Sequence, residues 1–329
     1  MFGKTAIGTE YRSENILSNK LGEVIDTIPV SGNIDGVYTF GTSRENFGAY
    51  IEHVYNYKKL SFSAGVLANW TSDYDWSFFP GADLSYEIFK DFRVFASANK
   101  SLRLPTFTDL YMTGINVGDK NLLPGEALTY ETGAKFHNKY SNTQVAVFKR
   151  EGKNVIDWVK DTSGYWNCKN IPELNTIGFE VSEKISTKVL FGKRFPINYI
   201  NVSYSYIEVE NKGYDFISKY ALDYLQHKLS ASTLHKIYRN IHASWKFSYQ
   251  ERAGTYSFID EDEVVREYAY EPFMLVDSRV FYKKDFMNLY VEASNIFNVE
   301  YHDLGYLTMP GRWIRIGAIF DIDIKSQNK

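Results

Sequence analysis

The chain has 329 residues, enough for one large domain, and its net charge of −3 lacks the basic excess that a nucleic-acid-binding surface requires. Aromatic residues make up 17% of the sequence, yet mean hydropathy is −0.34 and no apolar run reaches the ~18 residues of a membrane-spanning helix. The single cysteine, Cys168, excludes an internal disulfide. A soluble all-β protein and a membrane β-barrel both remain open, because barrel strands show lipid only every second side chain.

Alternation of apolar and polar residues is the dominant pattern of the sequence. It is clearest in 60–70, LSFSAGVLANW, and it recurs in 198–206, 241–250 and 287–294. Period two predicts strands with one apolar and one polar face. The polar positions are rich in Ser, Asn, Gln, Gly and Tyr, which is typical of a crowded, hydrated barrel interior and favours a transmembrane antiparallel β-barrel. The side chains expected to face lipid include Leu60, Phe62, Val66, Ile241, Phe247, Leu289 and Val291.

The links between these strands are expected to differ in length. Short links are predicted at 57–59, 89–91, 137–141, 235–240 and 283–285, and long ones at 14–46, 101–126, 208–222, 251–272 and 298–311. Short turns on one side and long loops on the other are typical of outer-membrane barrels, whose short side is periplasmic. The division gives about fourteen strands, with the first at 3–13 and a longer hairpin at 143–186. No linker or repeat interrupts the pattern, so we expect one domain over 1–329.

Three blocks of the sequence resemble TonB-dependent receptors. The segment 97–136 is similar to that family's S-x-R-x-P-t-x-x-D-L-Y, L-x-P-E and Y-E-x-G patterns, although Lys120 replaces a glycine and Gly125 is inserted before the glutamate. The segment 154–180 is similar to the family's I-D-W/Y hairpin, and 289–320 to its closing block. The blocks occur in the family's order. The matching residues include Arg103, Pro105, Asp109, Leu110, Tyr111, Leu123, Pro124, Glu126, Tyr130, Glu131, Gly133, Asn295, Phe297, Tyr301, Pro310, Gly311 and Arg312.

The resemblance implies the last strands, about fourteen in number, of a plugged 22-stranded barrel in the Gram-negative outer membrane. The first residues, MFGKTAIGTEYRS, carry no export signal, so we expect either that the signal was removed or that this is not a complete precursor. The strand count leaves the plug and the first strands outside this chain, which a split or truncated gene, a fragment or an upstream chain would explain. The implied partners are the missing plug portion of the receptor, TonB through that plug, the lipid membrane and a scarce small-molecule nutrient. The blocks look most like the cobalamin-receptor branch. A ferric-siderophore receptor and a passive porin-like channel are the alternatives.

Candidate ligand-binding residues lie in the long outward loops, where tyrosine combines a flat apolar body with a hydrogen-bonding tip. Mutual packing of these aromatics is the competing interpretation. We predict no metal site and no cofactor, although the acidic run that holds Asp260 and Asp262 is a weak calcium candidate. The candidate ligand-binding residues are Tyr111, Met112, Asn116, Tyr214, Phe216, Tyr256, Phe258, Tyr268, Tyr270, Tyr301 and Tyr306.

Catalysis is not predicted. The GKT at 3–5 lacks the upstream glycine of a phosphate-binding loop, and no GxSxG or HExxH is present. The six histidines have no metal-ligand spacing. Barrel enzymes such as phospholipases need a Ser/His or Asp/His set that the sequence does not offer, so we expect a transport protein.

Overall fold

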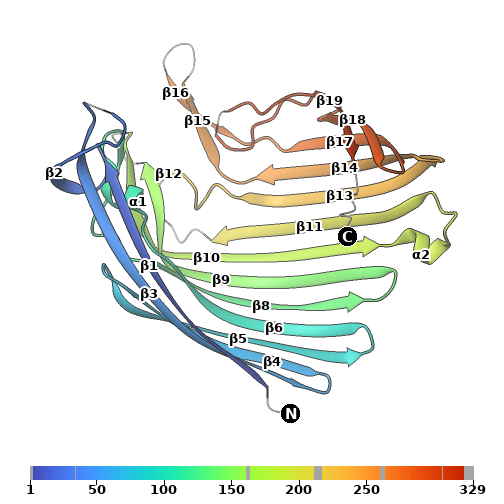
Figure 1. The fold of residues 1–329 in the computed structure, drawn as a ribbon, viewed down its shortest axis with the longest axis horizontal. Helices are drawn as coiled ribbons and strands as arrows, with labels where there is room; N and C mark the ends of the chain where they lie inside the picture. The colour runs from blue at the N-terminus through green and yellow to red at the C-terminus, as the bar shows by residue number, and fades with distance from the viewer. Residues whose placement is uncertain are drawn as a thin grey trace, which may run out of the picture. The chain divides into compact units, whose positions relative to one another are not determined.

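The computed structural model of the chain describes residues 3–33, 35–160, 164–210, 217–259, 264–305 and 307–321, and it is almost entirely β (Figure 1). Within these ranges no helix is both long enough and apolar enough to cross a membrane. The strands are β1 (Lys4–Ser18), β2 (Glu23–Pro29), β3 (Val37–Tyr57), β4 (Leu60–Thr71), β5 (Asp75–Phe89), β6 (Phe92–Arg103), β7 (Asn116–Val117), β8 (Gly125–His137), β9 (Ser141–Lys160), β10 (Trp166–Ile185), β11 (Ile197–Glu210), β12 (Ile217–Ser218), β13 (Leu225–Tyr238), β14 (Ile241–Arg252), β15 (Thr255–Ile259), β16 (Val265–Ala269), β17 (Phe273–Lys284), β18 (Met287–Ser294) and β19 (Trp313–Phe320). Two single-turn helices, α1 (Phe107–Tyr111) and α2 (Thr187–Phe191), lie in the links.

The chain divides into two compact units. Unit 1 comprises 1–134, 147–178 and 208–223, and unit 2 comprises 135–146, 179–207 and 224–329. In unit 1, antiparallel pairing runs β1–β3–β4–β5–β6, and β2 pairs with the start of β3. In unit 2 it runs β11–β13–β14–β17–β18–β19, with β15 and β16 forming a separate hairpin.

The register of the strands separates an apolar from a polar face. In unit 1, Val66 of β4 lies opposite Ile51 and Pro80, whereas Ser63 on the other face donates a 2.6 Å hydrogen bond to Glu52. In unit 2 the same separation places Phe247 opposite Ala231 and Val276, and Leu289 opposite Ala318. The seven side chains predicted to face lipid lie on one apolar face within each unit: Leu60, Phe62 and Val66 in unit 1, and Ile241, Phe247, Leu289 and Val291 in unit 2.

The strand count agrees with the alternation of the sequence. Within the described ranges, fourteen strands contain eight residues or more, and the remaining five are short pieces that lie in the links. The hairpin expected at 143–186 is formed by β9 and β10, and the turns that follow β3, β5, β8, β13 and β17 are short, as predicted.

Two expectations about links are wrong. Residues 14–46 were expected to form a loop, but β1 continues to Ser18 and pairs with β3 as far as Phe40. Backbone hydrogen bonds hold the strands together through residues 12–15 and 43–46, where both faces are polar and alternation is lost. Link length also fails to alternate strictly. We call the strand ends joined by the predicted long links the loop end, and those joined by the predicted short links the turn end. Only residues 72–74 join β4 to β5 at the loop end, while residues 186–196, which include α2, join β10 to β11 at the turn end.

Candidate ligand-binding loops

The first motif block folds into a compact structure around α1. The side chain of Thr106 accepts a 3.1 Å hydrogen bond from the Asp109 amide, and the Asp109 carboxylate accepts 3.0 Å bonds from the Thr106 amide and from Arg103 Nη2. This reciprocal capping explains how so short a helix persists. Arg103 also donates through Nη1 to the Ile156 carbonyl at 2.8 Å, so the block is tied to β9.

A buried apolar cluster lies beneath this block and joins the first two motifs. It consists of Leu110, Leu122, Ile156, Trp158 and Cys168, with Tyr111, Met112 and Trp166 packed against it. The Cys168 side chain, 1% exposed, points at Asp109 with its Sγ 3.6 Å from Oδ1. Residues about fifty positions apart thus form one core at the loop end of the strands. We refer to α1, this cluster and their hydrogen bonds as the loop core.

Arg44 is a central residue of the loop core that the sequence does not reveal. Its side chain is 3% exposed, and the guanidinium donates to Asp73 at 2.7 Å and to the Pro105 carbonyl at 2.8 Å. It also lies over the rings of Phe107 and Tyr74, 5.1 and 5.8 Å from the centroids. Burial raises the pKa of Tyr74, although the positive charge of Arg44 opposes that rise. Arg44 therefore connects β3, the β4–β5 turn and α1.

Asp157, the acidic residue of the I-D-W motif, fastens the link between β11 and β13. It is 1% exposed, and its carboxylate accepts hydrogen bonds from the Ser218 hydroxyl and, at 3.1 Å, from the Ala221 amide. Backbone pairing supports the same contact, because β12 pairs with the end of β9 and the Lys219 amide donates to the Trp158 carbonyl at 2.9 Å. The end of this loop, 217–222, is held against β9.

The third motif block is also structural. Asn295, 4% exposed, donates to the Val299 carbonyl and accepts from the Val299 amide, both at 2.8 Å, and its own amide donates to Asp277. The side chain of Asn298 accepts from the Arg312 amide at 2.8 Å and lies 2.6 Å from where a Cβ on Gly311 would be. A side chain at position 311 would therefore displace the Asn298 side chain and its hydrogen bond to Arg312. Arg312 donates to the Ile296 carbonyl, a loop-closing contact.

An aromatic cluster in unit 2 contains several of the predicted ligand residues. The Tyr256 ring lies 5.9 Å from Tyr268, 5.1 Å from Tyr270 and 5.4 Å from His302. Tyr270 is 7% exposed and its hydroxyl accepts from the Gly305 amide at 2.8 Å. Tyr301 packs on another ring, that of Phe273, at 4.5 Å, and burial beside Asp303 and Asp277 raises its pKa. The hairpin β15–β16 therefore packs against the loop at 301–305 through the contact of Tyr256 with His302.

The predicted ligand residues consequently differ in how accessible they are. Tyr268 and Phe258 remain exposed, at 41% and 42%, whereas Tyr270 is occupied by internal packing. Tyr111 and Met112 are partly buried on the loop core, and Asn116 pairs in parallel with Trp166. Over the ranges described, no group of three or more His, Cys, Asp and Glu side chains could hold a metal ion. Five predicted residues lie outside the described ranges: Tyr214, Phe216, Tyr306, Asp260 and Asp262.

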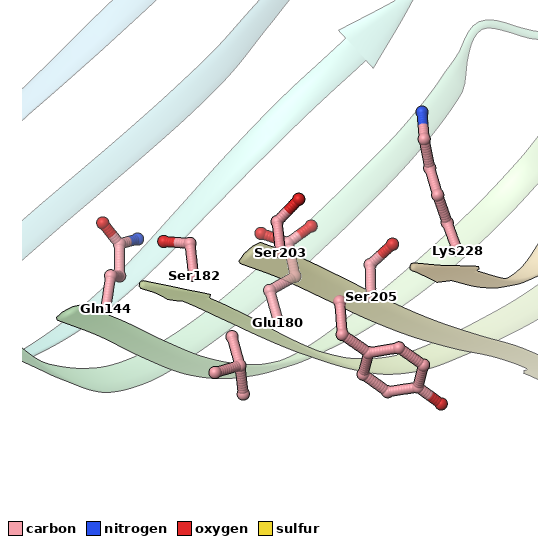
Figure 2. Close-up of a pocket in the computed structure, with 8 residues that line it drawn as sticks. Gln144, Glu180, Ser182, Ser203, Ser205 and Lys228 are labelled. Carbon is pink, nitrogen blue, oxygen red and sulfur yellow. The ribbon is translucent and has the colours of Figure 1, made fainter. Parts of the chain in front are cut away.

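A row of polar side chains on unit 2 was not singled out from the sequence. Figure 2 shows that these side chains, from β9, β10, β11 and β13, point to the same side of the sheet. They line a depression of about 230 Å³ and offer hydroxyl, amide, carboxylate and ammonium groups. The residues of this row that Figure 2 labels are Gln144, Glu180, Ser182, Ser203, Ser205 and Lys228. Such a surface suits water and polar solutes rather than an apolar core.

The chain is similar to a class of bacterial receptors in sequence and in fold. A sequence model described as TonB dependent receptor-like, beta-barrel matches residues 2–296, and the chain therefore belongs to that family. It is 25% identical over 229 residues to the Vitamin B12 transporter BtuB of Photobacterium profundum, a match that covers 65% of this chain and 36% of that protein.

Solved structures give the same fold. The siderophore receptor PirA from Acinetobacter baumannii superimposes with a TM-score of 0.73 at 14% identity, covering 96% of this chain and 52% of that one. The FrpB iron transporter from Neisseria meningitidis (F3-3 variant) gives 0.69 at 15% identity, covering 97% and 52%. The chain thus spans about half the length of these two receptors and 36% of the length of the vitamin B12 transporter.

Proposed function

We propose that this chain forms part of the wall of a TonB-dependent receptor in the Gram-negative outer membrane, which takes up a scarce nutrient. Family membership supports the proposal, as does the division of each unit's sheet into an apolar and a polar face. Within the family, the whole receptor includes a plug that contacts TonB. We propose the plug portion and TonB as partners of this chain.

The observation that carries the membrane assignment is the arrangement of aromatic residues on the apolar face of unit 1. Tyr11, Phe47, Trp70 and Trp76 lie opposite one another across β1, β3, β4 and β5. A second row, Tyr57, Leu60 and Tyr86, lies ten residues away along the strands. Ten residues span roughly 33 Å, or about 25 Å of membrane depth at a tilt of about 40°, which is the height of the apolar band in outer-membrane barrels.

Side chains between and beyond these rows fit that interpretation. Large apolar side chains between them are exposed to solvent, among them Ile51 (47%), Phe62 (39%) and Leu84 (45%), and an exposed apolar surface of this extent needs lipid or a partner. His53 is the departure, and its ring bonds to the Thr5 hydroxyl at 2.8 Å. Beyond the first row the face becomes polar: Glu45 lies there and accepts hydrogen bonds from Ser13 and from Tyr11 of the first row.

We propose a cobalamin as the nutrient. The support is the similarity of the motif blocks to the cobalamin-receptor branch and the sequence match to a vitamin B12 transporter. A ferric siderophore is the alternative, and the solved siderophore and iron receptors share too little sequence identity to favour it beyond the fold. The polar row of Figure 2 is compatible with either ligand, since both carry many hydrogen-bonding groups.

The test is uptake by cells that lack their own receptors. This chain is co-expressed with a plug-bearing N-terminal portion of the receptor, and import of radiolabelled cyanocobalamin is compared with import of ferric enterobactin, with and without TonB. We expect TonB-dependent cobalamin import from the reassembled receptor and none from the chain alone. Import of ferric enterobactin but not cobalamin would move the assignment to siderophores. Import independent of TonB would instead support a passive channel.

A further inference from the structure

The turn end of unit 2 concentrates positive charge. Its four links, which follow β8, β10, β13 and β17, lie at one end of the unit (Figure 1). Together with the strand ends next to them, these links cover residues 138–140, 186–196, 236–240 and 283–286, which contain eight basic residues and one acidic residue. The whole chain has 37 Lys and Arg against 40 Asp and Glu. We call the eight the basic turn cluster: Lys139, Lys188, Lys193, Arg194, Lys236, Arg239, Lys283 and Lys284.

The charges of this cluster lack carboxylate partners within the described ranges, and Arg239 lies over the ring of Tyr238, 5.1 Å from its centroid. Seven of the eight residues are exposed and Lys188 is half-buried. Among the residues that the structure describes, none of the eight forms an ion pair with a carboxylate. Like charges held together without counter-charges repel, so the cluster is best explained by an anionic partner.

An apolar protrusion lies beside these charges. Val189, Leu190 and Phe191 of α2 are 51%, 46% and 63% exposed, and Lys188, Lys193 and Arg194 flank them. An exposed apolar turn flanked by basic residues is the composition of an element that lies in the interface of an anionic membrane.

This protrusion is held in place rather than frayed. The Ser186 amide donates to the Tyr140 carbonyl at 2.7 Å, and the Thr187 hydroxyl donates to the Ile197 carbonyl at 2.6 Å. On the far side, the Lys236 amide donates to the Pro196 carbonyl at 2.8 Å. The fold therefore fixes α2 against three neighbouring segments and keeps its apolar side chains exposed. Exposure of apolar side chains to water is unfavourable, so we expect this surface to contact something other than water.

We propose that the basic turn cluster and α2 bind the anionic phospholipid headgroups of the leaflet at the turn end. The phosphates would contact the lysines and arginines while α2 enters the headgroup layer. Two further exposed aromatics lie at the same end, Tyr238 and Phe286, each 59% exposed. Tyr238 pairs with Ile241 of the apolar face, and the ring of Phe286 lies 6.4 Å from that of Phe320. Apolar surface that continues from the sheet to the cluster favours lipid over an acidic protein. This inference rests on the proposed membrane location.

The test uses the reassembled receptor in bilayers that contain spin-labelled lipids. Electron paramagnetic resonance gives the association of phosphatidylglycerol relative to phosphatidylcholine. We expect a preference for phosphatidylglycerol of roughly threefold at 0.05 M NaCl that falls towards one at 0.5 M, where the Debye length is only a few ångströms. The variants Lys193→Gln/Arg194→Gln and Lys283→Gln/Lys284→Gln should each lower the preference.

The matched control is Lys228→Gln/Lys246→Gln, which removes two charges from the polar face of the same unit and should leave the preference unchanged. Equal preference for both lipids, or equal loss in control and turn variants, would overturn the proposal. So would polyglutamate binding that depends on the turn lysines without any lipid preference, because it would indicate a protein partner. Absence of any motionally restricted lipid would instead refute the membrane location itself.

Discussion

Removal of the Asp157 carboxylate should release the loop at 217–222. The Asp157→Ala variant leaves the Ser218 hydroxyl and the Ala221 amide without their acceptor in a site where Asp157 is 1% exposed. Hydrogen bonds to a charged group contribute about 1.5–3 kcal/mol each, and water that enters the released site recovers part of that. We therefore expect local opening of the loop to become easier by about 2–4 kcal/mol.

Hydrogen exchange measured by mass spectrometry reports this opening directly. A change of about 2–4 kcal/mol corresponds to a loss of protection between about 30-fold and about 900-fold in peptides that cover 217–222. Ser218→Ala removes one donor and leaves the Ala221 contact, so its effect should be smaller, about tenfold. The loop core around α1 should keep its protection, since Arg103, Thr106 and Asp109 make their own contacts.

Asp83→Ala is the control, because this carboxylate is exposed on the polar face of β5. It should change protection of 217–222 by less than about twofold. If Asp157→Ala also leaves that protection unchanged, the loop is held by backbone pairing of β12 with β9 alone, and the reasoning from the buried carboxylate is wrong.

Three further predictions concern the faces, the buried thiol and the aromatic cluster. Val66→Arg on the apolar face should lower the free energy of unfolding in lipid by about 2–4 kcal/mol in urea titrations, whereas Ser61→Arg on the polar face should cost little, and equal costs would refute the assignment of faces. Cys168, at 1% exposure, should resist maleimide until denaturant is added, so that rapid labelling of the folded protein would contradict a packed loop core. Tyr268→Ala should weaken binding of cyanocobalamin with little loss of stability, whereas Tyr270→Ala should destabilise the β15–β16 hairpin by about 2 kcal/mol, and the reverse pattern would place the ligand elsewhere.

The sequence predicted the fold class and the two faces of the strands because both depend on a local rule. Successive side chains of a strand point to opposite sides, so one row of residues, such as Phe62, Ala64 and Val66, records which face is apolar. The rule fails where strands extend past the apolar band. Where residues 12–15 of β1 pair with residues 43–46 of β3 both faces are polar, and no alternation marks the stretch that pairs Glu14 with Arg44.

The motif blocks were recognisable in sequence, but only the tertiary structure gave them a physical role. Arg103, Asp109, Ile156 and Cys168 are separated by up to 65 positions and meet because the ends of β6 and β9 lie near the start of β10. Arg44 carries no sequence signal at all, since its partners are a turn aspartate and a backbone carbonyl in other segments. Contacts of this kind depend on where the strands end in space, which no local pattern of residues encodes.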